Sequence, residues 1–283
     1  MKIKTKIFSL VITAVLIFSL FIVDNYRDGL RNNALQSING GGAIITFDDR
    51  SILDWYEVDQ VLDKYNWKAT FFISHFHSLD FQDKQRLKTL QSKGHEIASH
   101  GNKHINATKF ISTNSIDEYI DVEILPSINE MKKEGFLVSS FAYPYGARST
   151  SVELFHKITC KIKTVLFGHK INALDRKLLS NFAIIRGTTY GKKYPSLHNN
   201  FANGSRVVFG LGIDESYGND IDYLYKVLRH AKENNKIAIF YSHRVSKDIN
   251  PSVYTSTYKT LEGITKYIVK NNMHFMTMKD LVN

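Results

Sequence analysis

A chain of 283 residues in which 43% of the residues are apolar is long enough to bury the core of one large α/β domain. Charged residues make up 23%, and no long low-complexity tract interrupts the sequence, which excludes global disorder. The formal net charge is +10, but no arginine-rich block accompanies it, so a generally basic surface without a nucleic-acid partner is expected. The single cysteine, Cys160, excludes an intrachain disulfide and a cysteine-based zinc site.

The first 23 residues have the pattern of an export or anchor segment. Three lysines within residues 2–6 precede an uncharged run, residues 7–23, whose length is near the lower limit for a membrane-spanning helix. No small-x-small cleavage site follows, so an uncleaved anchor is favoured over a cleaved signal. The basic residues before the run favour an amino terminus inside and a domain outside the membrane, while a cleaved signal would give a secreted protein. Residues 24–40 are expected to be a linker, and residues 41–283 a single domain.

From residue 43 onward, short apolar runs alternate with helical patterns. Strands are expected at 43–47, 69–73, 96–99, 139–143, 163–167, 182–185, 207–211, 237–241 and 274–277. Helices are expected at 54–65, 81–93, 115–134, 151–158, 220–234 and 256–271. This alternation predicts an α/β fold, with a parallel sheet or barrel surrounded by helices.

Two adjacent acids end the first expected strand. Asp48 and Asp49 would carry unsatisfied charge inside a buried strand, so they belong at its carboxyl end, where α/β folds place their chemistry. Successive side chains of a regular strand point to opposite faces, so the two acids are not expected to point the same way. One could bind a metal ion while the other serves as a base, and the alternative is that one of them caps a following helix or turn.

His100 and His104 follow the third expected strand at a spacing of four residues. One helical turn or a tight loop can direct both imidazoles at one ion, although this spacing also occurs by chance in pairs of surface histidines. Two histidines and one carboxylate form a three-ligand site that leaves a position open for water, as catalytic zinc requires. Zinc is the default divalent metal, and the same ligands also suit cobalt, nickel or iron.

Four motifs, in this order, resemble those of polysaccharide deacetylases, the NodB-like domains of carbohydrate esterase family 4. They are TFDD at 46–49, SHGNKH at 99–104, YPYG at 143–146 and YSH at 241–243. The resemblance spans residues 41–283. It implies a distorted (β/α) barrel of the NodB-like type, with the active site at the carboxyl ends of the strands.

The resemblance also implies a role for each matching residue. Asp48 resembles the catalytic base, and Asp49, His100 and His104 resemble the metal ligands. Tyr145 resembles the residue whose backbone N–H faces the oxyanion.

His243 resembles the histidine that acts as general acid, whereas taken alone it would be read as a core histidine after a buried strand. The family's late aspartate-tryptophan motif is not evident. Asp214 lies near its place with different neighbours, so His243 is expected to lack its usual partner.

A second departure from the family pattern concerns the catalytic base. Ala142 stands where many members have an arginine that braces the base by its charge. Arg186 follows an expected strand and should emerge at the carboxyl-end rim, from which it could reach Asp48 and orient it. The alternatives for Arg186 are a rim residue that grips an anionic group and a simple surface charge.

These observations predict a metal-dependent hydrolase, anchored to a membrane and facing outside or secreted, that removes N-acetyl groups from an acetylated polysaccharide. One alternative is an esterase acting on O-acetyl sugars, for which His243 is less essential because an alcohol leaves more easily than an amine. The other is a non-catalytic carbohydrate-binding relative. The intact acids and histidines argue against that second alternative.

Overall fold

The computed structural model describes residues 35, 37–148, 171–189, 204–248 and 254–282. All of them belong to one compact unit, Ala34–Asn283. The expected anchor at 7–23 and most of the expected linker lie outside the described residues, as do the expected helix at 151–158, Cys160 and the expected strand at 163–167. No helix among the described residues has the length and hydrophobicity needed to cross a membrane.

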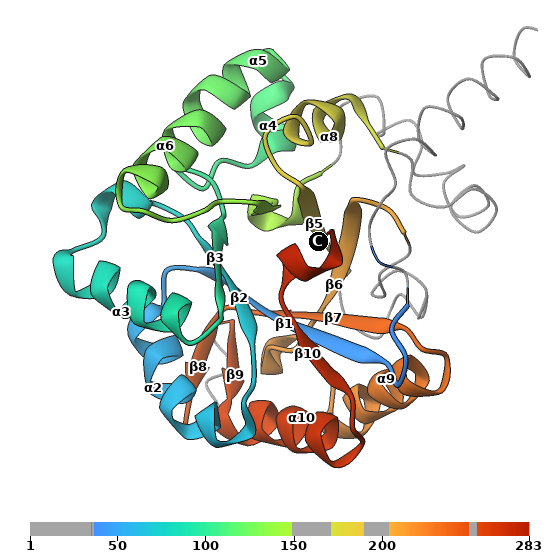
Figure 1. Ribbon diagram of the computed structural model, residues 1–283. Helices are drawn as coiled ribbons and strands as arrows, with labels where there is room; N and C mark the ends of the chain where they lie inside the picture. Colours follow the sequence, from blue (N-terminus) through green and yellow to red (C-terminus); the bar gives the residue numbers. More distant parts are fainter. Residues whose placement is uncertain (1–34, 36, 149–170, 190–203, 249–253, 283) are drawn as a thin grey trace, which may run out of the picture. The chain divides into compact units, whose positions relative to one another are not determined.

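Parallel strands close into a barrel (Figure 1), because β1 pairs with β2 on one side and with β7 on the other. The strands, in barrel order, are β1 (Gly42–Asp49), β2 (Ala69–Ile73), β3 (Glu96–Ser99), β4 (Ser140–Ala142), β5 (Ile184–Thr189), β6 (Val207–Gly212) and β7 (Ile237–Ser242). A further strand, β10 (His274–Met276), pairs with the start of β1. Since every pair in this sheet is parallel, all carboxyl ends lie at one end of the barrel. The expected (β/α) barrel is confirmed.

Two details of the strands differ from the expectation. Strand β5 was expected to end at residue 185, but it continues through Gly187 to Thr189. A glycine is needed at position 187 because the Phe209 ring packs against the backbone there: a Cβ would lie 2.8 Å from the ring. Two short strands that the sequence did not predict, β8 (Arg244–Ser246) and β9 (Thr255–Thr257), form a separate parallel pair.

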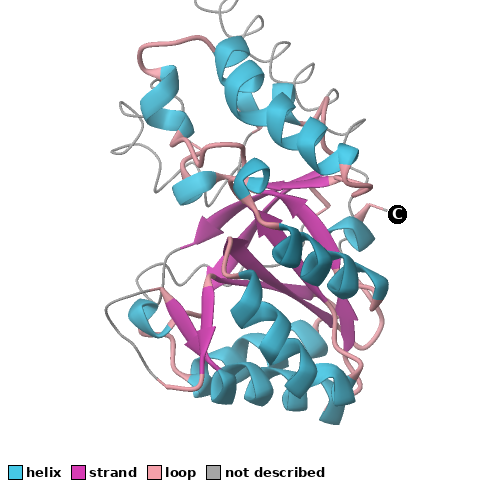
Figure 2. Cartoon of the chain, turned by 90° about the vertical axis from the view of Figure 1, so that its left-hand side faces the viewer, coloured by secondary structure: helices cyan, strands magenta, loops and turns pink. Residues whose placement is uncertain are grey.

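Helices lie outside the strands (Figure 2). The α-helices are α2 (Ile52–Leu62), α3 (Phe81–Ser92), α4 (Ala107–Ile111), α5 (Ile116–Tyr119), α6 (Leu125–Lys133), α8 (Ala173–Leu178), α9 (Ile221–Glu233) and α10 (Tyr258–Lys270). The short 3-10 helices are η1 (Asp63–Tyr65), η2 (Phe76–Ser78), η4 (Pro144–Gly146), η6 (Glu215–Tyr217) and η7 (Met278–Leu281). The expected helix at 115–134 is present, but a π turn, Ile120–Ile124, separates α5 from α6.

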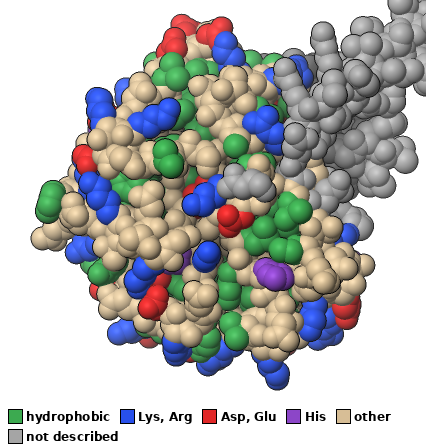
Figure 3. Space-filling model, in the orientation of Figure 1, with side chains coloured by type: hydrophobic (Ala, Val, Ile, Leu, Met, Phe, Trp, Pro, Cys, Tyr) green, Lys and Arg blue, Asp and Glu red, His purple; other side chains and the backbone are tan. Residues whose placement is uncertain are grey.

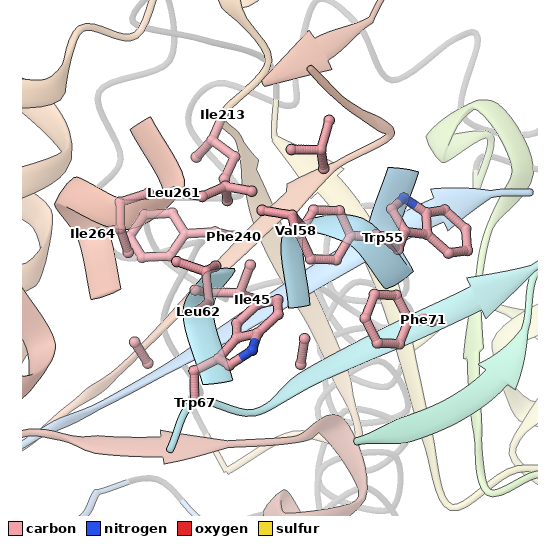
Figure 4. Packing of buried hydrophobic residues seen from close by; sticks show 14 of the residues in the cluster. Ile45, Trp55, Val58, Leu62, Trp67, Phe71, Ile213, Phe240, Leu261 and Ile264 are labelled. Atoms are coloured by element: carbon pink, nitrogen blue, oxygen red, sulfur yellow. The ribbon is translucent and has the colours of Figure 1, made fainter. Parts of the chain in front are cut away.

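Strand alternation divides the buried residues between the two faces of the barrel. Ala43, Ile45 and Phe47 of β1 pack outward into a cluster with helices α2, α3, α9 and α10, part of which is drawn in Figure 4. Ile44 packs inward. It belongs to a cluster that takes at least one residue from each of the seven strands and therefore fills the barrel: Ile44, Phe72, Ala98, Ala142, Ile184, Val208 and Ile239. The same alternation directs Asp48 inward.

The basic charge is distributed over the surface. On the face shown in Figure 3, Lys and Arg side chains are spread among acidic and neutral ones. This distribution agrees with the interpretation of a generally basic surface.

Candidate metal centre and active site

Asp48 and Asp49 both reach the carboxyl-end opening of the barrel. Asp48 points inward from β1 and is 2% exposed, and its Oδ2 lies 4.0 Å from His100 Nε2. Asp49 has a φ of 83°, which departs from strand geometry and brings its Oδ1 to 3.6 Å from the same nitrogen. The expectation that the two acids diverge is therefore wrong, because it holds only for a regular strand.

Asp49, His100 and His104 form a compact cluster of ligand atoms. Asp49 Oδ1 lies 3.1 Å from His104 Nε2, and the two histidine Nε2 atoms are 3.2 Å apart. One ligand atom from each residue lies within 4.8 Å of the others. Ligand atoms about 2.0–2.2 Å from a tetrahedral ion would be roughly 3.3–3.6 Å apart, so the observed separations fit a divalent cation.

Hydrogen bonding and burial keep His100 neutral, which is the state that a metal ligand requires. Its Nδ1 lies 2.9 Å from the carbonyl oxygen of Ala142, a contact that requires the proton on Nδ1 and leaves a lone pair on Nε2. Burial, only partly opposed by the charge of Asp48, lowers the pKa of His100 to about 4. Burial alone would raise the pKa of Asp49, but the hydrogen bond with His104 and the charge of His100 hold it well below its usual range.

Arg186 forms an ion pair with Asp48 inside the barrel. Its Nη2 lies 2.6 Å from Asp48 Oδ1 and 2.5 Å from Oδ2, and the guanidinium stacks between the rings of Phe72 and Tyr241, at 5.2 and 5.0 Å. The contact expected from the sequence is present. The expected position at the rim is wrong, because β5 continues beyond Arg186 and the side chain is fully buried. Burial also excludes a surface charge.

Ala142 and Arg186 are partners in the β4–β5 ladder. Arg186 therefore lies on the neighbouring strand, directly beside the position at which the family pattern has an arginine and this chain has Ala142. The small side chain of Ala142 belongs to the cluster that fills the barrel, together with Phe72, on which Arg186 stacks.

His243 has a carboxylate partner, so the expectation that it lacks one is wrong. Its Nδ1 lies 2.6 Å from Asp214 Oδ2, and its backbone N–H donates to Asp214 Oδ1 at 3.2 Å. Asp214 is fully buried and also accepts from the hydroxyl of Ser242. Burial would lower the pKa of His243, but the hydrogen bond and charge of Asp214 prevail and raise it.

Two exposed tyrosines lie beside His104 and His243. The Tyr145 ring centroid is 4.4 Å from that of His104, and the Tyr254 ring is 5.1 Å from that of His243. The exposed fractions of the two tyrosines are 59% and 57%. The oxyanion role of the Tyr145 backbone stays a prediction. No motif surrounds Tyr254, so there was no reason in the sequence to place it in the site. Asp214 could have been found, because it follows an expected strand, as the other site residues do.

The family model of polysaccharide deacetylase matches residues 38–160. A search of curated protein sequences found no match.

Several solved structures share the fold. The chitin deacetylase of Colletotrichum lindemuthianum is 14% identical with a TM-score of 0.52, covering 88% of this chain and 90% of its own. A CE4 esterase of Streptococcus mutans is 14% identical with a TM-score of 0.53, covering 89% and 90%. The Xyl-CE4 domain of a multidomain xylanase from the hindgut metagenome of Trinervitermes trinervoides is 16% identical with a TM-score of 0.51, covering 85% and 89%. The family match and the shared barrel confirm that this chain resembles the polysaccharide deacetylases, the NodB-like domains of carbohydrate esterase family 4.

Proposed function

We propose that this protein is a metal-dependent deacetylase that removes N-acetyl groups from an extracellular or cell-envelope polysaccharide. One observation carries the proposal: three groups meet at the carboxyl end of the barrel. They are the three ligand-type atoms of the candidate metal centre, the Asp48–Arg186 pair and the His243–Asp214 pair. Each of the three groups matches one requirement of amide hydrolysis: an electrophile site, a base and an acid.

Asp49, His100 and His104 would hold the divalent cation, with zinc as the default choice. When bound, such an ion polarises the acetyl carbonyl and lowers the pKa of a bound water. The chain contributes a preformed donor set. His100 is held neutral with its lone pair on Nε2, and the pKa of Asp49 lies well below its usual range, so its carboxylate is ionised.

Asp48 is assigned as the general base that takes the proton of the attacking water. Both of its oxygens lie within hydrogen-bonding distance of one Arg186 nitrogen, which fixes the carboxylate and balances its charge inside the barrel. Arg186 is a positioning residue in this scheme, since it acts through Asp48.

His243 is assigned as the general acid that protonates the leaving amine, without which the C–N bond would not break at neutral pH. Asp214 holds the Nδ1 proton and so leaves Nε2 as the atom that exchanges a proton. The Tyr145 backbone N–H is assigned to the developing oxyanion.

Acetate release by the purified full-length protein tests this proposal. The protein is stripped of metal with a chelator, reloaded with Zn²⁺ or Co²⁺, and assayed on chito-oligosaccharides and on acetylated xylan. We expect metal-dependent release from the N-acetylated substrate, loss of metal in His104→Ala, and retained metal with at least about a hundredfold lower turnover in Asp48→Asn. Release from xylan alone would favour the O-acetyl esterase. Metal binding without release from either substrate would favour the non-catalytic relative.

We propose further that residues 7–23 tether this domain to the outer face of a membrane. The support is the lysine-rich start, the uncharged run and the lack of a cleavage site in the sequence. The native protein should then fractionate with membranes and keep its original amino terminus. Mature protein in the medium with a new terminus near Asn25 would show a cleaved signal instead.

A further inference from the structure

The loop that carries His104 is wrapped around a buried carboxylate. Glu123, in the π turn between α5 and α6, is fully buried. Its Oε2 accepts the backbone N–H of Lys103 and its Oε1 accepts that of Ile105, both at 2.8 Å. These two residues flank His104 directly. The carboxylate therefore holds the backbone on both sides of a proposed metal ligand.

The backbone of the π turn binds the same loop. The N–H of Asn102 donates to the carbonyl of Glu123 at 2.9 Å, and the Asn102 side chain donates to the carbonyl of Val122 at 3.3 Å. Gly101 has a φ of +87°, and a Cβ on it would lie 2.1 Å from Glu123 Oε1. The carboxylate thus occupies the space that any side chain at position 101 would need.

The two histidines of the ligand set are held in different ways. His100 directly follows β3, and its ring is fixed by the carbonyl of Ala142. His104 lies in a loop and has a φ of 56°, a left-handed conformation that costs a residue with a Cβ roughly 1–2 kcal/mol. Its position 3.1 Å from Asp49 Oδ1 therefore depends on contacts that hold the loop. The contacts described above come from the π turn.

The π turn is what presents Glu123 to the loop. Five-residue π turns within helices are rare. Those that occur are often found at functional sites. Burial raises the pKa of Glu123, and the backbone N–H groups of Ile105 and Lys103 oppose that shift by stabilising the ionised form. Within the described part of the chain, no lysine or arginine forms an ion pair with Glu123. Burying an acid whose hydrogen bonds come from backbone amides costs free energy. The position of Glu123 is therefore better explained by the loop that it holds in place.

We propose that Glu123 is the positioning residue of the metal centre, setting the affinity for the cation by fixing the loop on which His104 is presented. This inference rests on the proposed function, because it requires that Asp49, His100 and His104 bind a divalent cation. Groups that orient a metal ligand without touching the metal typically change affinity by about 10–100-fold when they are replaced.

Glu123→Gln in the full-length protein is the test, because it keeps the side-chain volume but replaces one acceptor oxygen by an NH₂ group that cannot accept a backbone N–H. Glu96→Gln is the matched control. Glu96 is also buried and accepts the backbone N–H of Lys279 at 2.8 Å, but it lies at the start of β3, at the opposite end of the barrel. Two quantities are measured: the Zn²⁺ dissociation constant by competition with a chelating dye, and the hydrogen exchange of the Lys103 and Ile105 amides in the metal-free protein.

We expect Glu123→Gln to weaken Zn²⁺ binding at least about tenfold and to speed exchange of both amides, and Glu96→Gln to change neither while lowering the melting temperature. Faster exchange with unchanged affinity would overturn the inference and leave the proposed function intact. A wild-type protein that does not bind Zn²⁺ would overturn the proposed function, and Glu123 would then be a purely structural residue of the loop.

Gly101→Ala provides a second route if Glu123→Gln does not fold. The Cβ of the new alanine would displace the Glu123 carboxylate. This variant should therefore also weaken Zn²⁺ binding. Unchanged Zn²⁺ affinity in a folded Gly101→Ala protein would also overturn the inference.

Discussion

The barrel has a histidine–aspartate pair at each end, and the pairs differ in what else they bind. At the amino end, just before β3, His95 Nε2 lies 2.9 Å from Asp59 Oδ1 while its Nδ1 accepts the N–H of Ala69 at 3.0 Å. Asp59 also accepts from Trp67 Nε1 at 3.0 Å and from Lys93 Nζ at 2.7 Å. Both nitrogens of His95 are used, and its side chain is 1% exposed.

At the carboxyl end, His243 uses only one of its nitrogens in this way. Its Nδ1 is paired with Asp214, and none of the described residues forms a hydrogen bond with its Nε2. The side chain is 17% exposed. The two pairs have the same chemistry, but only His243 has a nitrogen that can give a proton to a substrate. A histidine–aspartate pair is therefore evidence of catalysis only when the second nitrogen is unused and accessible.

The buried acids at the two ends show the same contrast. Glu96 at the amino end accepts hydrogen bonds from Thr70, Ser140 and the N–H of Lys279, and burial raises its pKa. Asp48 at the carboxyl end is paired with the cation of Arg186. Neutral hydrogen-bond donors are enough to hold Glu96, which only connects strands. Asp48, which is proposed to accept a proton from water, is held by a full positive charge.

Removal of His243 should have the largest effect on turnover among the variants that test the two histidine–aspartate pairs and Arg186. His243→Ala should lower deacetylation of an N-acetylated oligosaccharide by at least about a hundredfold, because the amine would leave unprotonated. Hydrolysis of an O-acetyl ester should fall less, since an alcohol leaves more easily. Acetate release from both substrates checks this. Equal losses on both would remove the assignment of His243 as the general acid.

Removal of Arg186 should affect both stability and turnover. Arg186→Ala leaves Asp48 buried without its partner, which typically costs about 3–5 kcal/mol of unfolding free energy, and the loosened carboxylate should lower kcat about tenfold or more. The double variant Ala142→Arg/Arg186→Ala returns the charge from the adjacent ladder position and should recover part of both losses. Denaturant unfolding and acetate release measure them. An Arg186→Ala protein with unchanged kcat would contradict the positioning role.

Removal of the Asp214 charge should change the pH dependence of turnover. Asp214 raises the pKa of His243 against the effect of burial, so the protonated acid persists to higher pH than it would alone. In Asp214→Asn the pKa of His243 should fall, and the alkaline limb of the kcat profile should move to lower pH. A limb that stays in place would show that another group controls it.

The sequence predicted that Asp49, His100 and His104 lie together, and it failed on features that depend on distant partners. Asp48 and His100 could be placed because each lies at the end of an apolar run, and parallel strands bring their carboxyl ends together. The pairing of Asp214 with His243 was missed because no signature residue accompanies Asp214. The π turn was missed because one inserted turn hardly disturbs the helical pattern of residues 115–134. The short strands β8 and β9 have three residues each, which is too few to show periodicity.

Removal of the Asp59 charge, at the amino end of the barrel, should lower stability and leave turnover unchanged. Burial would raise the pKa of Asp59, but hydrogen bonds from His95, Lys93 and Trp67 lower it below its usual value. An acid with a depressed pKa in the folded state contributes stability that is present at neutral pH and is lost as the pH falls through that depressed value. Asp59→Asn should therefore lower the unfolding free energy by about 1–3 kcal/mol at pH 7, and by less in acid, with kcat unchanged. Denaturant unfolding at the two pH values and acetate release at pH 7 measure this. A lower kcat in a variant of unchanged stability would show that the His95–Asp59 pair also acts on the site, and the contrast between the two ends would fail.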